Sequence, residues 1–305
     1  MSIALIFPGQ GSQHIGMAKA LAEAEPIAAE TLALADEVLG FQLSKLMADG
    51  PEDALTVTEN AQPAILAHSI AVLRVIEGRL GRVIFSAGHS LGEFSAHVAA
   101  GTLSFSDALK VVRLRGELMH GAGTQTPGTM AAILGLSDKV VADVCAGVTA
   151  GTCVPANFNS RGQVVVSGDI SGVDECIVLA REAGAKRALK LKVSGAFHSP
   201  LMESAAKGLD GMLDSIEMHD PKFPVVSNVT ADLVSSAKEA RRLLVQQLTS
   251  PVRWRDSITT ILDAGVTHFI ELGPGGVLCG LNRKNAKGMP CHTVGEPKDL
   301  EVFDE

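Results

Sequence analysis

The sequence predicts an α/β protein with a hydrolase-like core, built on a mainly parallel sheet, and an inserted ferredoxin-like subdomain. Short apolar runs alternate with helical patterns along most of the chain, as in parallel sheets covered by helices. One of these runs, residues 83–87, leads through Gly-x-Ser-x-Gly at residues 88–92 into an alanine-rich helical pattern, which is the setting of a nucleophile elbow. The segment 128–193 has the predicted order β-α-β-β-α-β, which is ferredoxin-like.

The first half of the chain contains two predicted strands and several helices. Residues 2–7 are continuously apolar, as expected of a strand buried on both faces, and a glycine-rich loop follows at residues 8–13. The second strand is the run 83–87. Apolar residues at helical spacing predict the helices, which cover residues 17–24, 27–39, 58–76, 94–101 and 106–119.

The second half of the chain begins with the inserted segment. Its predicted strands are 130–134, 153–157, 163–167 and 187–193, and its predicted helices are 139–146 and 173–183. We expect residues 128–193 to form the subdomain, and residues 1–127 and 194–305 to form the core. The returning core has predicted strands at 224–227 and 267–272, helices at 237–248 and 254–264, and a short helical pattern after residue 276. The tail after residue 284 is expected to be irregular.

Composition limits the classes of function. With 46% hydrophobic and 20% charged residues, the chain is typical of a globular protein. Its formal net charge of -8 disfavours nucleic acid as the main partner. The apolar stretch 64–76 is too short to span a bilayer and is interrupted by His68, Ser69 and Arg74. The N-terminal residues lack the pattern of a signal peptide.

The five cysteines show neither C-x-x-C nor metal-ligand spacing. We therefore expect reduced thiols, no metal and a cytoplasmic protein.

Ser90 is the predicted nucleophile. In a strand–turn–helix elbow the serine hydroxyl lies at a helix N-terminus, where backbone N–H groups favour developing negative charge. The N–H of Leu91, the residue after the serine, is the expected first oxyanion donor. A glycine-bracketed surface turn is the simpler alternative, which the flanking strand and helix disfavour.

A nucleophilic serine needs a base, which is usually a histidine. His198 is the preferred candidate because it lies in a loop at the predicted joint between core and subdomain. His14 competes with it, and His89 should point away from its neighbour Ser90. No acidic residue is an obvious partner for the histidine, since Asp220 and Asp232 lie in ordinary loops. A backbone carbonyl could fix the imidazole tautomer instead.

Metal and phosphate motifs are missing from the sequence. It contains no H-E-x-x-H, no G-x-x-x-x-G-K-[ST] and no G-x-G-x-x-G after a strand. Gly273-Pro274-Gly275-Gly276 is best interpreted as a tight strand-to-helix turn.

Seven segments in order resemble the malonyl-CoA:acyl-carrier-protein transacylases, over residues 3 to about 283. They are Phe7-Pro8-Gly9-Gln10-Gly11-Ser12-Gln13, Ala61-Gln62-Pro63-Ala64, Gly88-His89-Ser90-Leu91-Gly92-Glu93, Arg115-Gly116, Asn157-Phe158-Asn159-Ser160, Gly195-Ala196-Phe197-His198-Ser199 and Glu271-Leu272-Gly273-Pro274-Gly275. The resemblance implies that Ser90 carries the malonyl group, that His198 is its base and that the backbone carbonyl of Gln247 orients this histidine. It also implies an oxyanion hole made by the backbone amides of Gln10 and Leu91.

The same resemblance implies how the substrates are recognised. Arg115 pairs with the free malonyl carboxylate, for which a guanidinium is well suited, and Gln62 and Asn157 line the acyl pocket. Phe197 before the histidine accompanies malonyl selection in related modular acyltransferases. No cofactor is expected to remain bound, since malonyl-CoA is a substrate and the acyl carrier protein supplies the phosphopantetheine.

The carrier protein is acidic, so docking on this acidic chain needs a local basic patch. Lys186 and Arg187 match the family's basic pair, with Lys190, Lys192, Arg283, Lys284 and Lys287 as further candidates. We expect a monomer that makes malonyl-carrier protein for fatty acid synthesis. The alternatives are the same transfer in a polyketide or malonate decarboxylase system, a serine hydrolase or thioesterase, and a non-catalytic docking subunit.

Overall fold

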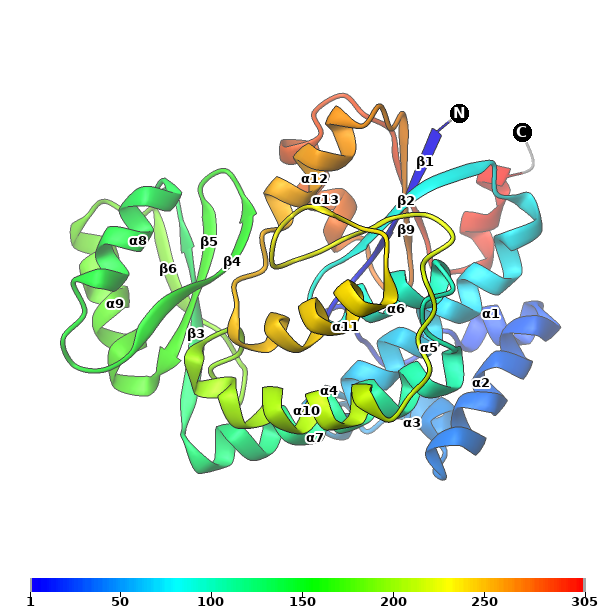
Figure 1. Cartoon of the computed structure of the whole chain (residues 1–305), viewed down its shortest axis with the longest axis horizontal. Coiled ribbons are helices and arrows are strands. Elements are labelled where there is room, and N and C mark those ends of the chain that lie inside the picture. Colours follow the sequence, from blue (N-terminus) through cyan, green and yellow to red (C-terminus); the bar gives the residue numbers. More distant parts are fainter. Residues whose placement is uncertain (1, 304–305) are drawn as a thin grey trace.

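The computed structural model describes residues 2–303, so the predicted core limits at residues 1 and 305 lie outside the described residues. It contains two sheets (Figure 1). The larger has the order β10-β9-β1-β2-β7-β8 and is parallel except for the pair β7–β8; the smaller has the order β4-β5-β3-β6 and is antiparallel. The α/β class with a mainly parallel sheet is therefore confirmed.

The strands are β1 (Ser2–Phe7), β2 (Arg82–Gly88), β3 (Gly128–Leu134), β4 (Cys153–Ser160), β5 (Gln163–Asp169), β6 (Arg187–Lys190), β7 (Val225–Val226), β8 (Leu233–Val234), β9 (His268–Leu272) and β10 (Cys291–Val294). The α-helices are α1 (Lys19–Ala24), α2 (Pro26–Leu39), α3 (Leu43–Asp49), α4 (Glu52–Thr56), α5 (Thr58–Ile76), α6 (Gly92–Ala99), α7 (Phe105–Gln125), α8 (Asp138–Ala146), α9 (Ile170–Glu182), α10 (Glu203–Asp214), α11 (Ala237–Gln246), α12 (Trp254–Asp263) and α13 (Val277–Asn285). None of these helices combines the length and hydropathy needed to cross a membrane.

The larger sheet places the functional loops at the C-terminal ends of its strands. β1 lies between β9 and β2, and its residues Ile3, Leu5 and Phe7 are at most 1% exposed, as predicted for a strand covered on both faces. The loops after β1 and β2 consequently leave the sheet side by side, at the edge where ligands bind in open α/β sheets. His89 N donates to the Phe7 carbonyl across this edge, at 3.0 Å.

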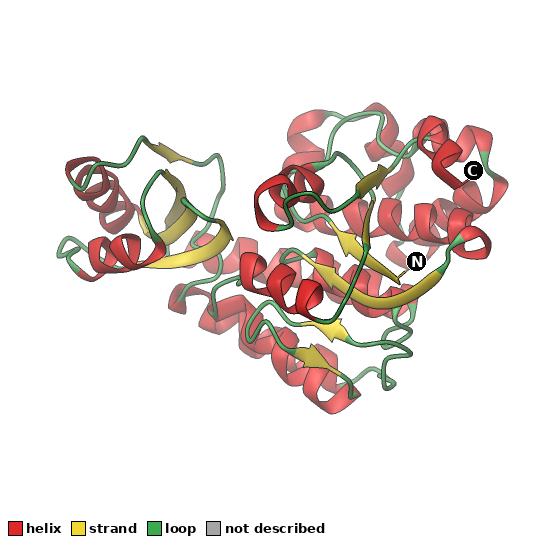
Figure 2. Cartoon of the chain, turned by 90° about the horizontal axis from the view of Figure 1, so that it is seen from above, coloured by secondary structure: helices red, strands yellow, loops and turns green. Residues whose placement is uncertain are grey.

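The smaller sheet, with α8 and α9 on one face, forms a lobe beside the larger part of the molecule (Figures 1 and 2). Its elements follow the order β3-α8-β4-β5-α9-β6. The lobe is joined to the rest at β4, where Phe158 N donates to Val252 O at 2.9 Å and Val252 N donates to Ala156 O at 2.8 Å. Glycine is needed at the start of β3, because a Cβ on Gly128 would lie 2.6 Å from the Cβ of Ala196.

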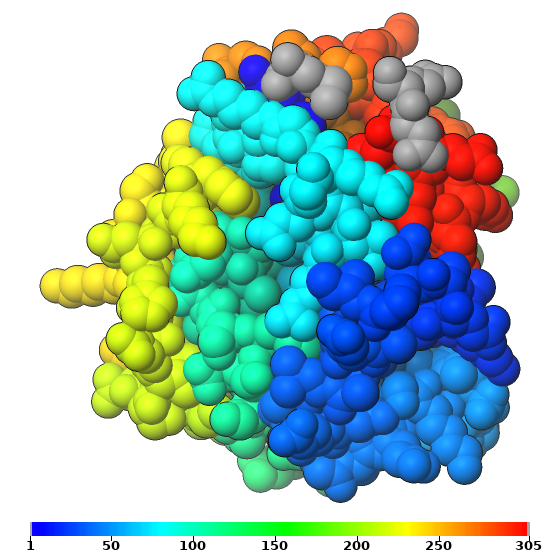
Figure 3. Space-filling model, turned by 90° about the vertical axis from the view of Figure 1, so that its right-hand side faces the viewer, coloured from blue at the N-terminus to red at the C-terminus, as the bar shows by residue number. Residues whose placement is uncertain are grey.

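The prediction that the tail after residue 284 is irregular is wrong. β10 adds a parallel strand beside β9, and the 3-10 helix Pro297–Phe303 follows it. Leu300 is 6% exposed and shares an apolar cluster with Leu21 and Ala28 of the first helices. The red C-terminal segment accordingly lies against the dark-blue N-terminal helices in Figure 3.

Three helices were not expected from the sequence. α3 and α4 are too short to show a clear helical period, and α10 contains Gly208 and Gly211, which lower helix propensity. α10 is amphipathic and buries Leu209 and Leu213, so tertiary packing stabilises a helix that propensity disfavours.

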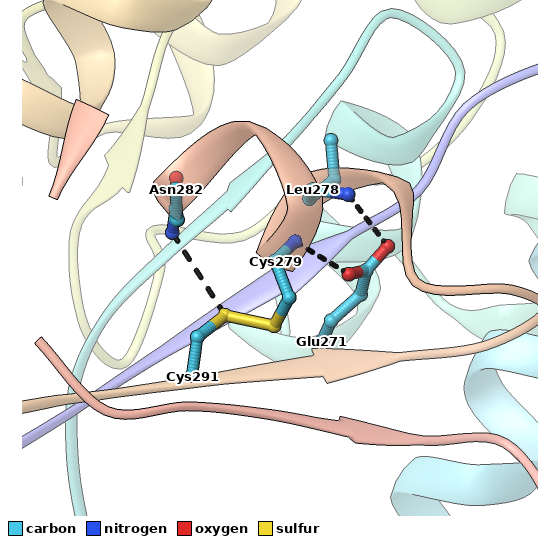
Figure 4. Close-up of a disulfide and its surroundings, with 5 residues drawn as sticks. All are labelled: Glu271, Leu278, Cys279, Asn282 and Cys291. Carbon is cyan, nitrogen blue, oxygen red and sulfur yellow. Dashed lines mark hydrogen bonds between the residues drawn. A yellow bond between two sulfur atoms is a disulfide. The ribbon is translucent and has the colours of Figure 1, made fainter. Parts of the chain in front are cut away.

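The prediction of five reduced cysteines is wrong for two of them. Cys279, in the first turn of α13, and Cys291, at the start of β10, form a disulfide (Figure 4). Glu271 on β9 accepts hydrogen bonds from the backbone N–H groups of Leu278 and Cys279, at 3.0 and 2.7 Å. The disulfide and this carboxylate both fix the N-terminal turn of α13, whose Val277 and Leu278 help to line the cavity described below. The spacing of these two cysteines in the sequence does not indicate a disulfide.

Candidate active site

Ser90 lies on a tight turn between β2 and α6. Its backbone φ is 52°, a left-handed conformation that is rare for residues other than glycine. The flanking glycines are required by close approach: a Cβ on Gly88 would lie 1.9 Å from the Gly92 carbonyl carbon, and a Cβ on Gly92 would lie 2.1 Å from Phe7 O. This is the geometry of a nucleophile elbow.

Asn228, a buried residue that the sequence analysis missed, holds this turn. Its Oδ1 accepts a hydrogen bond from Ser90 N at 2.7 Å, and its Nδ2 donates to Gly88 O at 2.7 Å. An asparagine side chain offers one acceptor and two donors, so it replaces backbone partners that the strained turn cannot provide. Asn228 follows the short strand β7, and its partners lie 138 and 140 residues away.

The structure connects Ser90, His198 and the Gln247 carbonyl by two successive hydrogen bonds. Ser90 Oγ lies 2.8 Å from His198 Nε2, and His198 Nδ1 lies 2.9 Å from Gln247 O. The carbonyl only accepts, so Nδ1 must carry the proton and Nε2 is the acceptor for the serine hydroxyl. The arrangement is that of a serine and its general base, with a carbonyl in place of the triad acid.

Burial decides the charge of this histidine. His198 is 4% exposed, and its pKa falls to about 3, mainly because burial penalises the imidazolium and secondarily because Arg115 is nearby. The lowered pKa means that the neutral form, which can accept a proton, persists far below pH 6.5.

We therefore expect Ser90 to keep its reactivity toward an uncharged sulfonyl fluoride between pH 8 and pH 5. A histidine with the ordinary pKa of about 6.5 would lose about 30-fold in rate over this range. Stopped-flow or mass-spectrometric rates measured across the range test this, with Ser90→Ala as the background and circular dichroism to verify folding. A rate that falls with a midpoint near pH 6.5 would contradict the lowered pKa of His198.

Arg115 reaches the serine from α7 and is 1% exposed. Its Nη1 donates to Gln62 Oε1 at 2.7 Å, and its Nη2 donates to Gln247 Oε1 at 2.8 Å and to Ser90 Oγ at 3.2 Å. Burial lowers the pKa of Arg115 to about 10, so the guanidinium remains charged at neutral pH. Its acceptors are all uncharged, which leaves the positive charge for a ligand carboxylate.

A cavity of about 400 Å³ opens beside Ser90 and His198, between the two sheets. Gln10, Asn157 and Phe197 line it, whereas Gln62 lies beneath it as a partner of Arg115. Within residues 2–303, no group accepts a hydrogen bond from the backbone N–H of Gln10 or Leu91. Both amides are therefore available to a ligand oxygen.

The competing candidates form hydrogen bonds with other groups. His89 turns away from Ser90 to Asn159, with Nε2 and Oδ1 2.8 Å apart. His14 Nδ1 lies 3.4 Å from Ser12 O, and Asp220 accepts from Ala237 N at 2.8 Å. Among the described residues, none of these three forms a hydrogen bond or ion pair with His198.

Arg187 is the first residue of β6 and Lys186 immediately precedes it, and both are exposed. Neither forms an ion pair with a described residue, whereas Lys190 pairs with Asp174 at 2.7 Å.

One group of three residues in the described part of the chain could offer ligands to a metal. The Sγ atoms of Cys145, Cys153 and Cys176 all lie within 4.8 Å of one another, in the apolar core of the smaller lobe. They come from α8, β4 and α9, which is why their spacing in the sequence indicated nothing. None of the three lines the cavity beside Ser90.

Comparisons with known proteins agree over nearly the whole chain. Residues 4–299 match the family described as acyl transferase domain. The malonyl CoA-acyl carrier protein transacylase of Bacillus subtilis (strain 168) is 47% identical over 302 residues, which cover 98% of this chain and 95% of that protein. The protein of the same name from Haemophilus influenzae is 41% identical over 305 residues, 99% of this chain and 98% of the relative.

Solved structures show the same likeness. An acyl carrier protein S-malonyltransferase from Vibrio cholerae has a TM-score of 0.95 and 42% identity, covering 98% of this chain and 99% of its own. A malonyl-transacylase solved with a type II PKS acyl-carrier protein has a TM-score of 0.95 and 41% identity, covering 99% of both chains. This chain therefore belongs to the acyl transferase family, among the malonyl-CoA:acyl-carrier-protein transacylases.

Proposed function

We propose that this chain transfers the malonyl group of malonyl-CoA to the phosphopantetheine thiol of an acyl carrier protein, through a malonyl-Ser90 intermediate, in fatty acid synthesis. One observation carries the proposal: Ser90 Oγ lies 2.8 Å from His198 Nε2 and 3.2 Å from Arg115 Nη2. A nucleophile, a neutral base and a cation suited to a carboxylate thus meet at one atom. The match to this chain covers at least 95% of the length of each named relative.

In the first half-reaction, Ser90 Oγ attacks the thioester carbonyl carbon while His198 Nε2 takes the hydroxyl proton. The oxygen of the tetrahedral intermediate receives hydrogen bonds from the amides of Gln10 and Leu91. The C–S bond then breaks, and CoA leaves as the thiol with the proton returned by His198. In the second half-reaction His198 takes the proton of the carrier's thiol, whose sulfur attacks the malonyl-Ser90 ester. The ester C–O bond then breaks, and His198 returns the proton to Ser90 Oγ.

Arg115 selects the acyl group in this proposal. A bidentate pair with the free malonyl carboxylate would fix the substrate so that its thioester carbonyl faces Ser90. Gln62 and the side chain of Gln247 orient the guanidinium, at 2.7 and 2.8 Å. Asn157 and Phe197 line the same cavity and limit the space for the acyl group.

We also propose the finer description of the fold. The order β4-β5-β3-β6 of the smaller antiparallel sheet, with a helix in each crossover, supports the ferredoxin-like assignment of residues 128–193. The Ser90 elbow on a mainly parallel sheet supports a hydrolase-like core made of residues 1–127 and 194–305.

No bound cofactor takes part in this scheme, because CoA and the phosphopantetheine arrive and leave with the substrates. A cytoplasmic monomer remains part of the proposal.

The decisive experiment follows radiolabel from malonyl-CoA, and separately from acetyl-CoA, onto the protein and then onto added holo carrier protein. Malonyl label that moves from protein to carrier would support the proposal. Label that appears as free malonate would favour a hydrolase. No label from either ester would overturn both the transferase and the hydrolase hypotheses. Comparing a fatty acid carrier with a polyketide carrier separates the two pathways, since one structural relative was solved with a type II PKS carrier.

Lys186 and Arg187 are expected to receive the acidic carrier protein. Replacing both with glutamate should raise the KM for the carrier at least about tenfold, because close charge pairs at interfaces are worth more than about 1.4 kcal/mol. Malonyl loading of Ser90 from malonyl-CoA should stay unchanged. The double replacement Lys238→Glu and Lys298→Glu, at exposed positions on α11 and the C-terminal 3-10 helix, is the matched control. An unaltered carrier KM would remove the pair from the docking surface.

A further inference from the structure

Glu93 is a buried acid next to the catalytic serine that the scheme above leaves without a role. It lies in the first turn of α6, three residues after Ser90, and is 1% exposed. Its Oε2 accepts hydrogen bonds from Gln247 Nε2 at 2.5 Å and from Asn228 N at 3.3 Å, whereas its Oε1 has no partner in the described residues. Burial raises its pKa to about 7, an effect that these hydrogen bonds and the charge of Arg115 oppose. Burying a carboxylate costs free energy unless it is paired and fully hydrogen-bonded, and Glu93 is only partly satisfied.

The carboxylate determines which way the Gln247 amide faces. Gln247 Nε2 donates to Glu93 Oε2 and, at 3.1 Å, to Ser90 O. The Ser90 carbonyl can only accept, and so can the carboxylate of Glu93 when it is ionised, so the amide group must present its NH₂ to them. Its Oε1 is thereby turned toward Arg115 Nη2, at 2.8 Å.

This chain of contacts keeps Arg115 oriented without neutralising it. The direct acceptors of the guanidinium are Gln62 Oε1, Gln247 Oε1 and Ser90 Oγ, and no acidic residue within residues 2–303 pairs with it directly. A carboxylate in direct contact would occupy the bidentate face that an acyl carboxylate needs. Glu93 instead acts through one intervening amide, and its negative charge still favours the protonated arginine.

We propose that Glu93 is a positioning residue for acyl selection: through the Gln247 amide it holds Arg115 oriented and unpaired for the free carboxylate of the incoming acyl group. The inference rests on the proposed malonyl transfer and adds the residue that prepares the carboxylate-binding arginine. Glu93 does not touch the reacting atoms. Its effect should therefore depend on Arg115 and on a carboxylate in the substrate.

The test is Glu93→Gln, which keeps the shape but removes the charge and adds a donor, so that the Gln247 amide loses its fixed orientation. We measure kcat and KM for Ser90 loading from malonyl-CoA and from acetyl-CoA. The malonyl-to-acetyl ratio of kcat/KM should fall at least tenfold, and Glu93→Asp, which retains the charge, should recover part of it. Glu30→Gln, at an exposed position on α2, is the matched control and should leave both substrates unaffected.

A double-mutant cycle separates positioning from a structural effect. In an Arg115→Ala background, Glu93→Gln should change the malonyl-to-acetyl ratio less than twofold, because the residue through which it acts is gone. Equal losses for malonyl-CoA and acetyl-CoA would overturn the inference. So would a fall in the malonyl-to-acetyl ratio that is as large in the Arg115→Ala background as in the wild type. If Glu93→Gln does not fold, the same ratio measured for Glu93→Ala, which also removes the charge, decides, and an unaltered ratio there overturns the inference. A wild-type protein that does not load malonyl at all would instead overturn the proposed function.

Discussion

Replacing Ser90 with alanine is expected to abolish malonyl loading and to lower the overall transfer at least about 10⁴-fold. The covalent route needs an oxygen nucleophile at this position, and removing one member of a serine–histidine pair costs about as much as removing both. The elbow should survive, because its conformation depends on Gly88, Gly92 and the hydrogen bonds of Asn228 to the backbone. Intact-protein mass spectrometry should show a malonyl adduct on the wild type and none on Ser90→Ala.

His198→Ala provides the companion measurement. Its loss should be of similar size, and the double variant should be little worse than either single variant, since the two side chains act as one unit across the 2.8 Å contact. His120→Ala, at an exposed position on α7, controls for the loss of an imidazole. A malonyl adduct of normal yield on Ser90→Ala would place the nucleophile elsewhere and refute the assignment.

The local part of this site can be predicted from sequence because its signals are local. The elbow is specified by two glycines and by the strand and helix that flank the serine, all within about ten residues. The contact of His198 with Gln247 joins residues 49 apart, so periodicity cannot reveal it, and only the family resemblance suggested it. Asn228 carries no motif at all, because its role comes from a backbone turn 138 residues away.

The missed parts of the fold have the same cause. β10 pairs with β9 only after α13 has turned the chain back, and the disulfide between Cys279 and Cys291 follows from that return. α10 forms against glycine's low helix propensity because its apolar face packs on other helices. In each case a tertiary contact outweighs the local preference that a sequence displays. The same holds for functional residues. Glu93 belongs to the segment 88–93 that the family resemblance singles out, yet only the three-dimensional structure shows that its partners are Gln247 and Asn228.

Replacing Arg115 is expected to remove the preference for malonyl over acetyl. The kcat/KM for malonyl loading should fall about 10²–10³-fold in Arg115→Ala, since truncating one partner of a buried charge pair costs about 2–5 kcal/mol. Acetyl loading should fall far less, because acetyl-CoA presents no carboxylate to the guanidinium. The comparison uses loading rates for both esters on the wild type and on the variant.

Arg115→Lys is expected to behave differently from Arg115→Ala. An ammonium keeps the positive charge but cannot hold Gln62, Gln247 and a carboxylate in one plane, so malonyl loading should be intermediate and the acyl preference only partly kept. Arg242→Ala, at an exposed position on α11, serves as the matched control, and thermal melts verify that each variant is folded. If Arg115→Ala lowers malonyl and acetyl loading by the same factor, the guanidinium supports the fold of the site and does not recognise the acyl carboxylate. A selective loss would instead explain why this chain buries a charged arginine whose acceptors are all neutral: the missing anion is the substrate.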